Sequence, residues 1–321
     1  MRRREFITLL GGATTWPLMA LAQQPAMPLI GFLRSSTLAD ATNLMAAFRQ
    51  GMKETGYVDG QNVGTEYRFA ENDRDKLTAL VKDFIHRPVA VFVGNLVAAL
   101  AAKAASTTVP IVFATGTDPV KDGLVTNLNR PGGNVTGVSF FSAALGAKRL
   151  EQLRQLVPSA TTIGVLDGPD DNEDRGDVEV AAQAIGQQLI VLSASNASEI
   201  QAAFATFVQR GVGALIIASN AFTHSHRNEI VALAAQYKLP ASYGLRENAT
   251  AGGLISYAAS ITDAYRQVGV YAGRILKGEK PGDLPVVQST KFEFVINLKT
   301  AKRLGLTVPL IMQMTADEVI E

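Results

Sequence analysis

The first half of the chain alternates short apolar runs with segments in which apolar residues recur every three to four positions. The runs are typical of buried strands and the recurring positions of amphipathic helices. One helix is expected over 41–55, where Leu44, Phe48 and Met52 form a stripe. The predicted strands of this half are 28–33, 63–70, 89–94, 110–115 and 134–140, and further helices are expected at 73–85, capped by Asp73, and from about 96.

The same rhythm restarts near residue 142. After an expected helix at 142–156, predicted strands at 161–167, 189–194, 213–219 and 239–244 alternate with helices at 178–186, 198–209 and 228–237. Near-continuous apolar strands separated by helices indicate parallel sheets that are covered on both faces. Two such series predict an α/β protein of two doubly wound, Rossmann-like lobes.

The C-terminal part continues differently. A strand is expected at 252–259, then a helix with Tyr265 and Val268 on its apolar stripe, and then a strand and short helix within 291–306. We assign 28–141 and about 260–289 to lobe 1, and 142–259 and about 290–321 to lobe 2. Segments that cross between the lobes in this way would form a multi-strand hinge.

The first 22 residues have a different pattern, in which arginines precede an apolar run and then Ala20-Leu21-Ala22. This is the layout of a cleaved secretory signal peptide, with a cut expected after Ala22. Arg3 and Arg4, followed by Glu5, Phe6 and Ile7, resemble a twin-arginine export signal. The alternatives are the general secretory route and an N-terminal membrane anchor, although the run is short for a bilayer span.

Composition limits the kinds of partner, metal site and anchor that the protein can have. Removing 22 of the 321 residues leaves 299 and changes the net charge from +1 to −1, a balance that indicates neither a nucleic-acid partner nor an anionic membrane surface. No other apolar run approaches the length of a bilayer span, so we expect no stable membrane insertion after signal removal. The chain has no cysteine, which excludes disulfides, cysteine-based zinc sites and a cysteine-linked lipid. We therefore expect an exported periplasmic protein.

Enzyme signatures are absent from the sequence: it contains no dinucleotide-binding glycine motif after a strand, no phosphate-binding loop, no HExxH and no GxSxG. We expect no cofactor and no metal. The His224-Ser225-His226 triplet is interpreted as a solvated loop at a helix start, and the acidic run 167–177 as a surface loop.

Polar residues follow several predicted strands, and in open α/β sheets ligands bind outside these carboxyl ends. Serine, threonine and asparagine at such positions can instead cap the next helix. The candidates are Ser35, Ser36, Asn95, Thr115, Thr117 and Asp118 in the first lobe and Asp167, Asn220, Tyr243 and Arg246 in the second.

Two motifs carry a specific resemblance. Thr117-Asp118-Pro119 follows the fourth strand, and 128–137 reads LNRPGGNVTG. Together with 251–257 and the C-terminal segments, they resemble the tryptophan/tyrosine-type substrate-binding proteins of ABC transporters over essentially the whole mature chain. The resemblance implies a type I periplasmic binding fold whose lobes close on a small molecule and deliver it to a membrane permease.

The resemblance also implies roles for the candidates. Asp118 would meet a ligand amine, Ser35, Ser36 and Asn95 a carboxylate, and Phe140 and Tyr243 an apolar wall. The chain departs from the family pattern at 95–98, at 167–170 and at Asn220, where an aspartate is usual. Arg246 would favour a simple aromatic or aliphatic acid over an amino acid. We expect a monomeric transport receptor; a periplasmic sensor and an exported enzyme are the alternatives.

Overall fold

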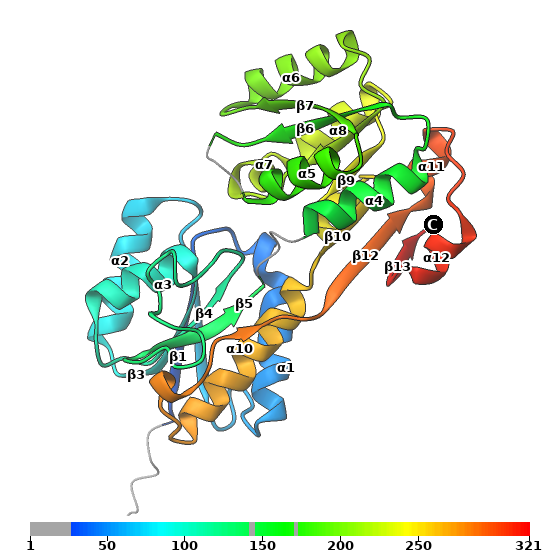
Figure 1. Ribbon diagram of the computed structural model, residues 1–321. Coiled ribbons are helices and arrows are strands. Elements are labelled where there is room, and N and C mark those ends of the chain that lie inside the picture. Colours follow the sequence, from blue (N-terminus) through cyan, green and yellow to red (C-terminus); the bar gives the residue numbers. More distant parts are fainter. Residues whose placement is uncertain (1–26, 141–144, 170–172) are drawn as a thin grey trace, which may run out of the picture.

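The computed structural model describes residues 27–140, 145–169 and 173–321, so the expected signal at 1–22 lies outside the described residues. The described chain forms two bodies side by side, each built on one sheet flanked by helices (Figure 1). We call the body that contains the first strand lobe 1 and the other lobe 2. This architecture confirms the predicted two-lobe α/β class.

Lobe 1 contains a wholly parallel sheet. Its strand order is β11 (Val287–Gln288), β5 (Val135–Ser139), β4 (Ile111–Thr115), β3 (Val89–Asn95), β1 (Leu29–Arg34) and β2 (Gly64–Phe69). Its helices are η1 (Ala39–Ala41), α1 (Thr42–Glu54), α2 (Arg74–His86), α3 (Leu96–Ala105), α10 (Ile261–Leu276) and η3 (Pro281–Asp283).

The alternation of side chains along β1 divides the core of lobe 1. Ile30 and Phe32 point to the face covered by α1 and α10, whereas Leu33 points to the face covered by α2 and α3. As expected, Asp73 caps α2, because its side chain accepts the backbone N–H of Lys76 at 2.9 Å.

Lobe 2 contains a parallel sheet with one antiparallel pair, β10 with β12. Its strand order is β13 (Glu318–Ile320), β12 (Phe292–Asn297), β10 (Ile255–Ala259), β9 (Ala241–Tyr243), β8 (Ala214–Ile217), β6 (Thr162–Asp167) and β7 (Gln188–Ser193). Its helices are α4 (Gly146–Leu156), α5 (Glu173–Ala184), α6 (Ala197–Gln209), α7 (Ala221–Ser225), α8 (Arg227–Gln236), α9 (Arg246–Thr250), α11 (Leu298–Arg303) and α12 (Leu310–Thr315).

The described elements pass between the sheets three times: from β5 to α4, from β10 to α10 and from β11 to β12 (Figure 1). Backbone hydrogen bonds join the later two connections to their surroundings. The N–H of Ser260 donates to the carbonyl of Lys291 at 2.8 Å, and that of Ser289 donates to Ser139 at 2.8 Å. These connections keep the lobes adjacent while leaving each with its own sheet.

Helix α10 returns from lobe 2 and packs on α1 with its backbone in close approach. A Cβ added at Gly269 would lie 2.2 Å from the carbonyl oxygen of Phe48, and one at Gly51 would lie 1.8 Å from that of Arg266. Only glycine permits this contact at either position.

Candidate functional site

The carboxyl ends of β1 and β3 bring Ser35 and Asn95 together. The Asn95 Nδ2 donates to Ser35 Oγ at 2.7 Å, and the backbone N–H of Ser35 donates to Asn95 Oδ1 at 3.2 Å. Asn95 stands at the N-terminus of α3 but does not cap it with its side chain. The two predicted site residues therefore form one hydrogen-bonded unit at the edge of lobe 1.

The loop after β4 is held by its own polar side chains. The hydroxyls of Thr115 and Thr117 lie 2.7 Å apart, and Thr117 donates to the carboxylate of Asp122. Asp118 Oδ1 accepts the backbone N–H groups of residues 120 and 121 at 2.9 and 3.3 Å. One oxygen of Asp118 thus shapes the turn. The ring of Phe140 lies over Gly116, where an added Cβ would approach it to 2.8 Å.

Arg34, the last residue of β1, is a basic group that the sequence analysis did not select. Its Nε donates to Ser36 Oγ at 3.2 Å, its Nη1 donates to the hydroxyl of Tyr265 on α10, and its guanidinium lies 5.1 Å from that ring's centroid. Within the described ranges Arg34 has no acidic partner closer than 4 Å. It is a half-buried cation at the same edge as Ser35.

The matching edge of lobe 2 joins Asp167 and Asn220. Asp167 is fully buried at the end of β6, and its Oδ1 accepts hydrogen bonds from Asn220 Nδ2 at 2.9 Å and from the backbone of Gly168 at 2.7 Å. Asn220 also caps α7, since its Oδ1 accepts the N–H of Thr223 at 2.9 Å. The amide at 220 therefore links two strand ends, a connection for which its Nδ2 donor is needed.

Two predicted residues of lobe 2 lie elsewhere. Tyr243 is 1% exposed and belongs to the core cluster that packs α6 and α8 on the sheet, so the expected ligand-facing wall at this position is wrong. Burial raises its pKa. Arg246 donates from Nε to Glu318 Oε2 at 3.0 Å, so its charge is met within lobe 2 and is not left for a ligand.

The acidic run 167–177 is not a surface loop throughout, as had been expected. Helix α5 begins at Glu173, and Asp174 forms a buried ion pair with Arg149 of α4. Arg149 is 1% exposed and also donates from Nη1 to the carbonyl of Ile217 at 3.3 Å, while Asp174 Oδ2 accepts the N–H of Ser219 at 2.7 Å. This pair fixes the end of β8 beneath the edge that carries Asn220.

One ion pair joins the two lobes within the described chain. Arg227 Nη2, at the start of α8, lies 3.0 Å from Asp40 Oδ1 in η1, and Thr37 Oγ1 donates to Asp40 Oδ2 at 2.7 Å. Burial raises the pKa of Asp40, but the hydrogen bonds from Thr37 and Arg227 outweigh it and hold that pKa below 3.8. The strand-end edges of the two lobes therefore face each other.

His224 lies beside this contact, and the prediction of a solvated loop is wrong for it. It belongs to α7, and its Nδ1 is buried and finds no hydrogen-bond partner in the described part of the chain. Burial, followed by the charge of Arg227, lowers its pKa below 6.5; Glu247 and Asp40 oppose that shift, and Arg34 adds to it across the two lobes.

Three charged residues of this region, Arg34, Asp40 and Arg227, were not selected from the sequence. Arg34 directly precedes Ser35, so the rule that selected polar residues after strands would have reached it if extended by one position. Asp40 and Arg227 are 187 positions apart, and no local pattern connects them.

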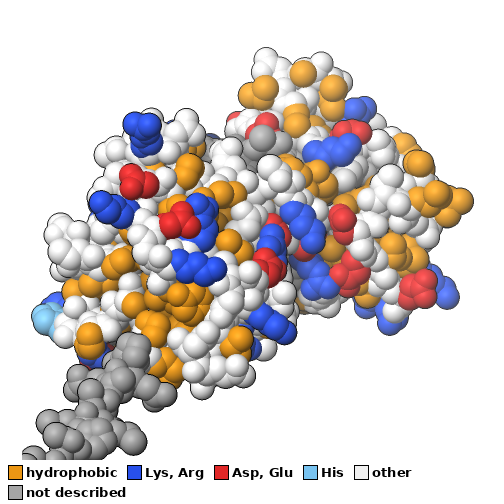
Figure 2. Space-filling model, turned by 90° about the horizontal axis from the view of Figure 1, so that it is seen from below, with side chains coloured by type: hydrophobic (Ala, Val, Ile, Leu, Met, Phe, Trp, Pro, Cys, Tyr) orange, Lys and Arg blue, Asp and Glu red, His pale blue; other side chains and the backbone are white. Residues whose placement is uncertain are grey.

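The described residues lack the features of two other kinds of site. They contain no group of three or more metal-ligating His, Asp or Glu side chains and no helix of the length and apolar character that a membrane crossing requires. Figure 2 shows positive and negative side chains lying beside one another on the face seen from below. Such mixing leaves no strong field of one sign on that face.

Comparisons with known proteins bear on the fold and the family. The family model described as ABC transporter substrate binding protein matches residues 40–320. A tyrosine-binding protein of Clostridioides difficile (strain R20291) is 25% identical over 276 residues, which are 85% of this chain and 78% of that protein.

Solved structures match over nearly the whole described chain. The ABC domain in complex with L-Trp from Streptococcus pneumonia is 27% identical, with a TM-score of 0.80, over 91% of this chain and 99% of that one. A conserved domain protein from Vibrio cholerae has a TM-score of 0.79 at 24% identity with the same coverage, which supports the fold alone. The predicted periplasmic-binding fold is confirmed, and the chain belongs to the ABC transporter substrate-binding protein family.

Proposed function

We propose that this protein is the solute receptor of an ABC importer, and that its lobes close on a small carboxylate-bearing ligand between their facing edges. Ligand binding shifts the open–closed equilibrium toward the closed form, which then docks on a membrane permease. The segment 1–22 directs export to the periplasm and is removed after Ala22, and the mature receptor acts as a monomer. The site carries out no catalysis.

We infer the ligand class from the environment of Arg34. A half-buried guanidinium without a carboxylate partner is costly to keep unless an anion meets it. The neighbouring hydroxyls of Ser36 and Tyr265 already orient it. An arginine held in this way is suited to a planar carboxylate, which it can contact through two N–H groups.

The remaining candidates take supporting roles in this proposal. Ser35 and Asn95 supply hydrogen bonds near the carboxylate, together with Thr117, whose hydroxyl the buried Thr115 holds in place, and Phe140 supplies an apolar wall. The second carboxylate oxygen of Asp118 meets the ligand amine. Because similar proteins are a tyrosine-binding protein and a complex with L-Trp, we propose an aromatic amino acid or a closely related acid as the ligand.

Titration calorimetry with three related compounds tests the proposal. L-Tryptophan should bind, tryptamine, which lacks the carboxylate, should bind much more weakly, and indole-3-propionate, which lacks the amine, reports on Asp118. The Arg34→Gln variant should lose roughly tenfold to a hundredfold in affinity for carboxylates, the effect of one charged hydrogen-bonded contact.

Arg246→Gln is the matched control, because Glu318 already neutralises that arginine. Equal binding of tryptamine and L-tryptophan, with no loss in Arg34→Gln, would contradict the carboxylate assignment. Mass spectrometry should recover the ligand unchanged, and uptake by membranes that carry the partner permease should require the receptor. A signalling response without uptake would favour a sensor instead.

A further inference from the structure

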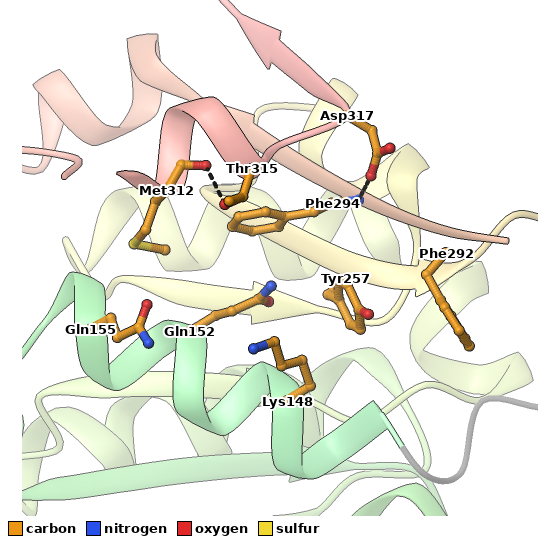
Figure 3. A pocket seen from close by; sticks show the side chains of 9 residues that line it. All are labelled: Lys148, Gln152, Gln155, Tyr257, Phe292, Phe294, Met312, Thr315 and Asp317. Carbon is orange, nitrogen blue, oxygen red and sulfur yellow. Dashed lines mark hydrogen bonds between the residues drawn. The ribbon is translucent and has the colours of Figure 1, made fainter. Parts of the chain in front are cut away.

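A groove in lobe 2 lies outside the facing edges of the lobes. Its volume is about 410 Å³, and it runs between α4 on one side and β10, β12 and α12 on the other. Figure 3 shows its lining residues, which include Lys148, Gln152 and Gln155 from α4 and Tyr257, Phe292 and Phe294 from the strands. This volume falls in the range of small-molecule sites.

The strand side of the groove is aromatic. The rings of Tyr257 and Phe292 are stacked with centroids 5.9 Å apart, and Phe294 meets Tyr257 edge-on at 6.3 Å. Phe292 is 37% exposed, whereas Phe294 is buried. Together these rings offer a flat apolar surface that is open to an incoming planar group.

The helix side is polar, because Lys148, Gln152 and Gln155 follow the i, i+4, i+7 spacing of one helical face. Lys148 pairs with Glu151 at 2.9 Å. Gln152 is different: it is only 5% exposed, its amide reaches toward Tyr257 and Phe294, and its Oε1 finds no hydrogen-bond donor in the described part of the chain. Polar groups buried without a partner are rare in proteins, because each one costs stability.

The neighbouring polar groups of the groove form hydrogen bonds elsewhere and do not donate to Gln152 Oε1. Asp317 Oδ2 accepts the backbone N–H of Phe294 at 2.8 Å, and Thr315 Oγ1 donates to the carbonyl of Met312 at 3.1 Å (Figure 3). Gln152 Oε1 therefore remains an acceptor without a donor among the described residues, beside an aromatic surface.

We propose that this groove is a second small-molecule site, which takes a planar aromatic ligand that carries an N–H or O–H donor. The ring stacks on Tyr257 and Phe292, and the donor bonds to Gln152 Oε1. The site is separate from the one between the lobes and does not depend on the ligand proposed there.

Fluorine NMR with 5-fluoroindole as the reporter tests this site. Indole should displace the reporter at a roughly fivefold lower concentration than indene, its isostere without the N–H, which is the effect of one neutral hydrogen bond. In Gln152→Leu that preference should vanish, and in Phe292→Ala both competitors should weaken. Arg154→Gln, an exposed position on the same helix, serves as the control.

Two further measurements separate the alternatives. Gln152→Leu should melt at or above the temperature of the wild type, because it removes an unpartnered polar group. A marked fall in melting temperature, or an unchanged preference for indole, would overturn the proposal. So would loss of the reporter signal in Arg34→Gln but not in Gln152→Leu, since indole would then occupy the site between the lobes.

Discussion

The ion pair between Asp40 and Arg227 should control how readily the lobes close. Asp40→Asn removes one charge without changing side-chain size, Arg227→Gln removes the other with a shorter polar side chain, and the double variant completes a thermodynamic cycle. Because the two atoms lie 3.0 Å apart and belong to different lobes, the pair can form only when the facing edges are together. Either substitution should therefore favour the open form.

The magnitude follows from distance and exposure. The side chains are 23% and 26% exposed, between the surface and buried cases. Two unit charges about 4 Å apart attract by about 4 kcal/mol at an effective dielectric of about 20. Desolvation and side-chain ordering offset most of this, and fully exposed pairs retain about 1 kcal/mol or less. We expect about 1.4 kcal/mol, which is a tenfold change in the closure equilibrium.

Spin labels placed on α2 and α6, one in each lobe, measure the effect. Each single variant should shift the distance distribution toward longer separations, and ligand affinity should fall by up to the same tenfold factor, because binding must then work against the open form. A coupling energy near zero in the cycle, or distance distributions identical to the wild type, would refute the reasoning.

Perturbations at His224, Arg149 and Gly269 test other parts of the structure. Lowering the pH below about 6.5 should lower the free energy of unfolding, because burial and the charge of Arg227 hold the pKa of His224 below its ordinary value in the folded chain, so the unfolded chain takes up a proton first; urea melts of His224→Gln should depend less on pH. Arg149→Met should lower the free energy of unfolding by about 3–5 kcal/mol in urea melts, since Asp174 would lose its arginine partner at a buried position, and a loss below about 1 kcal/mol would argue against that role. Gly269→Ala should lower the free energy of unfolding by at least about 1–3 kcal/mol, because its methyl group would collide with the backbone of α1. Gly176→Ala in α5, where the added methyl group meets nothing within 4 Å, should instead raise the free energy of unfolding by about 0.5–1 kcal/mol.

The rhythm of apolar runs was sufficient to predict the two-lobe fold, because buried parallel strands and amphipathic helices have distinct periods. It failed where tertiary contacts decide local structure. Helix α5 begins at Glu173 and not at 178, since its first turns carry Asp174 into the buried pair with Arg149. Periodicity alone cannot predict where a helix starts when that start depends on a partner residue in another helix.

The candidate site was predictable only in part, for a geometric reason. The selection of polar residues that follow strands places a residue at the carboxyl edge of the sheet, and it correctly brought Ser35 beside Asn95 and Asp167 beside Asn220. It does not give the direction of the side chain, which is why Tyr243 proved to be a core residue. Whether a charge is already paired, as for Arg246, depends on a strand about 70 positions away.

The crossing of the chain between lobes has a consequence for how the protein is made. The core of lobe 1 includes Tyr265 and Val268 from α10, and the core of lobe 2 includes Phe294 and Ile296 from β12. Each lobe therefore completes its core only after the ribosome has added α10 and β12, respectively. A nascent chain that stops before residue 261 leaves both cores open to water, so the two lobes must complete their folding late and almost together.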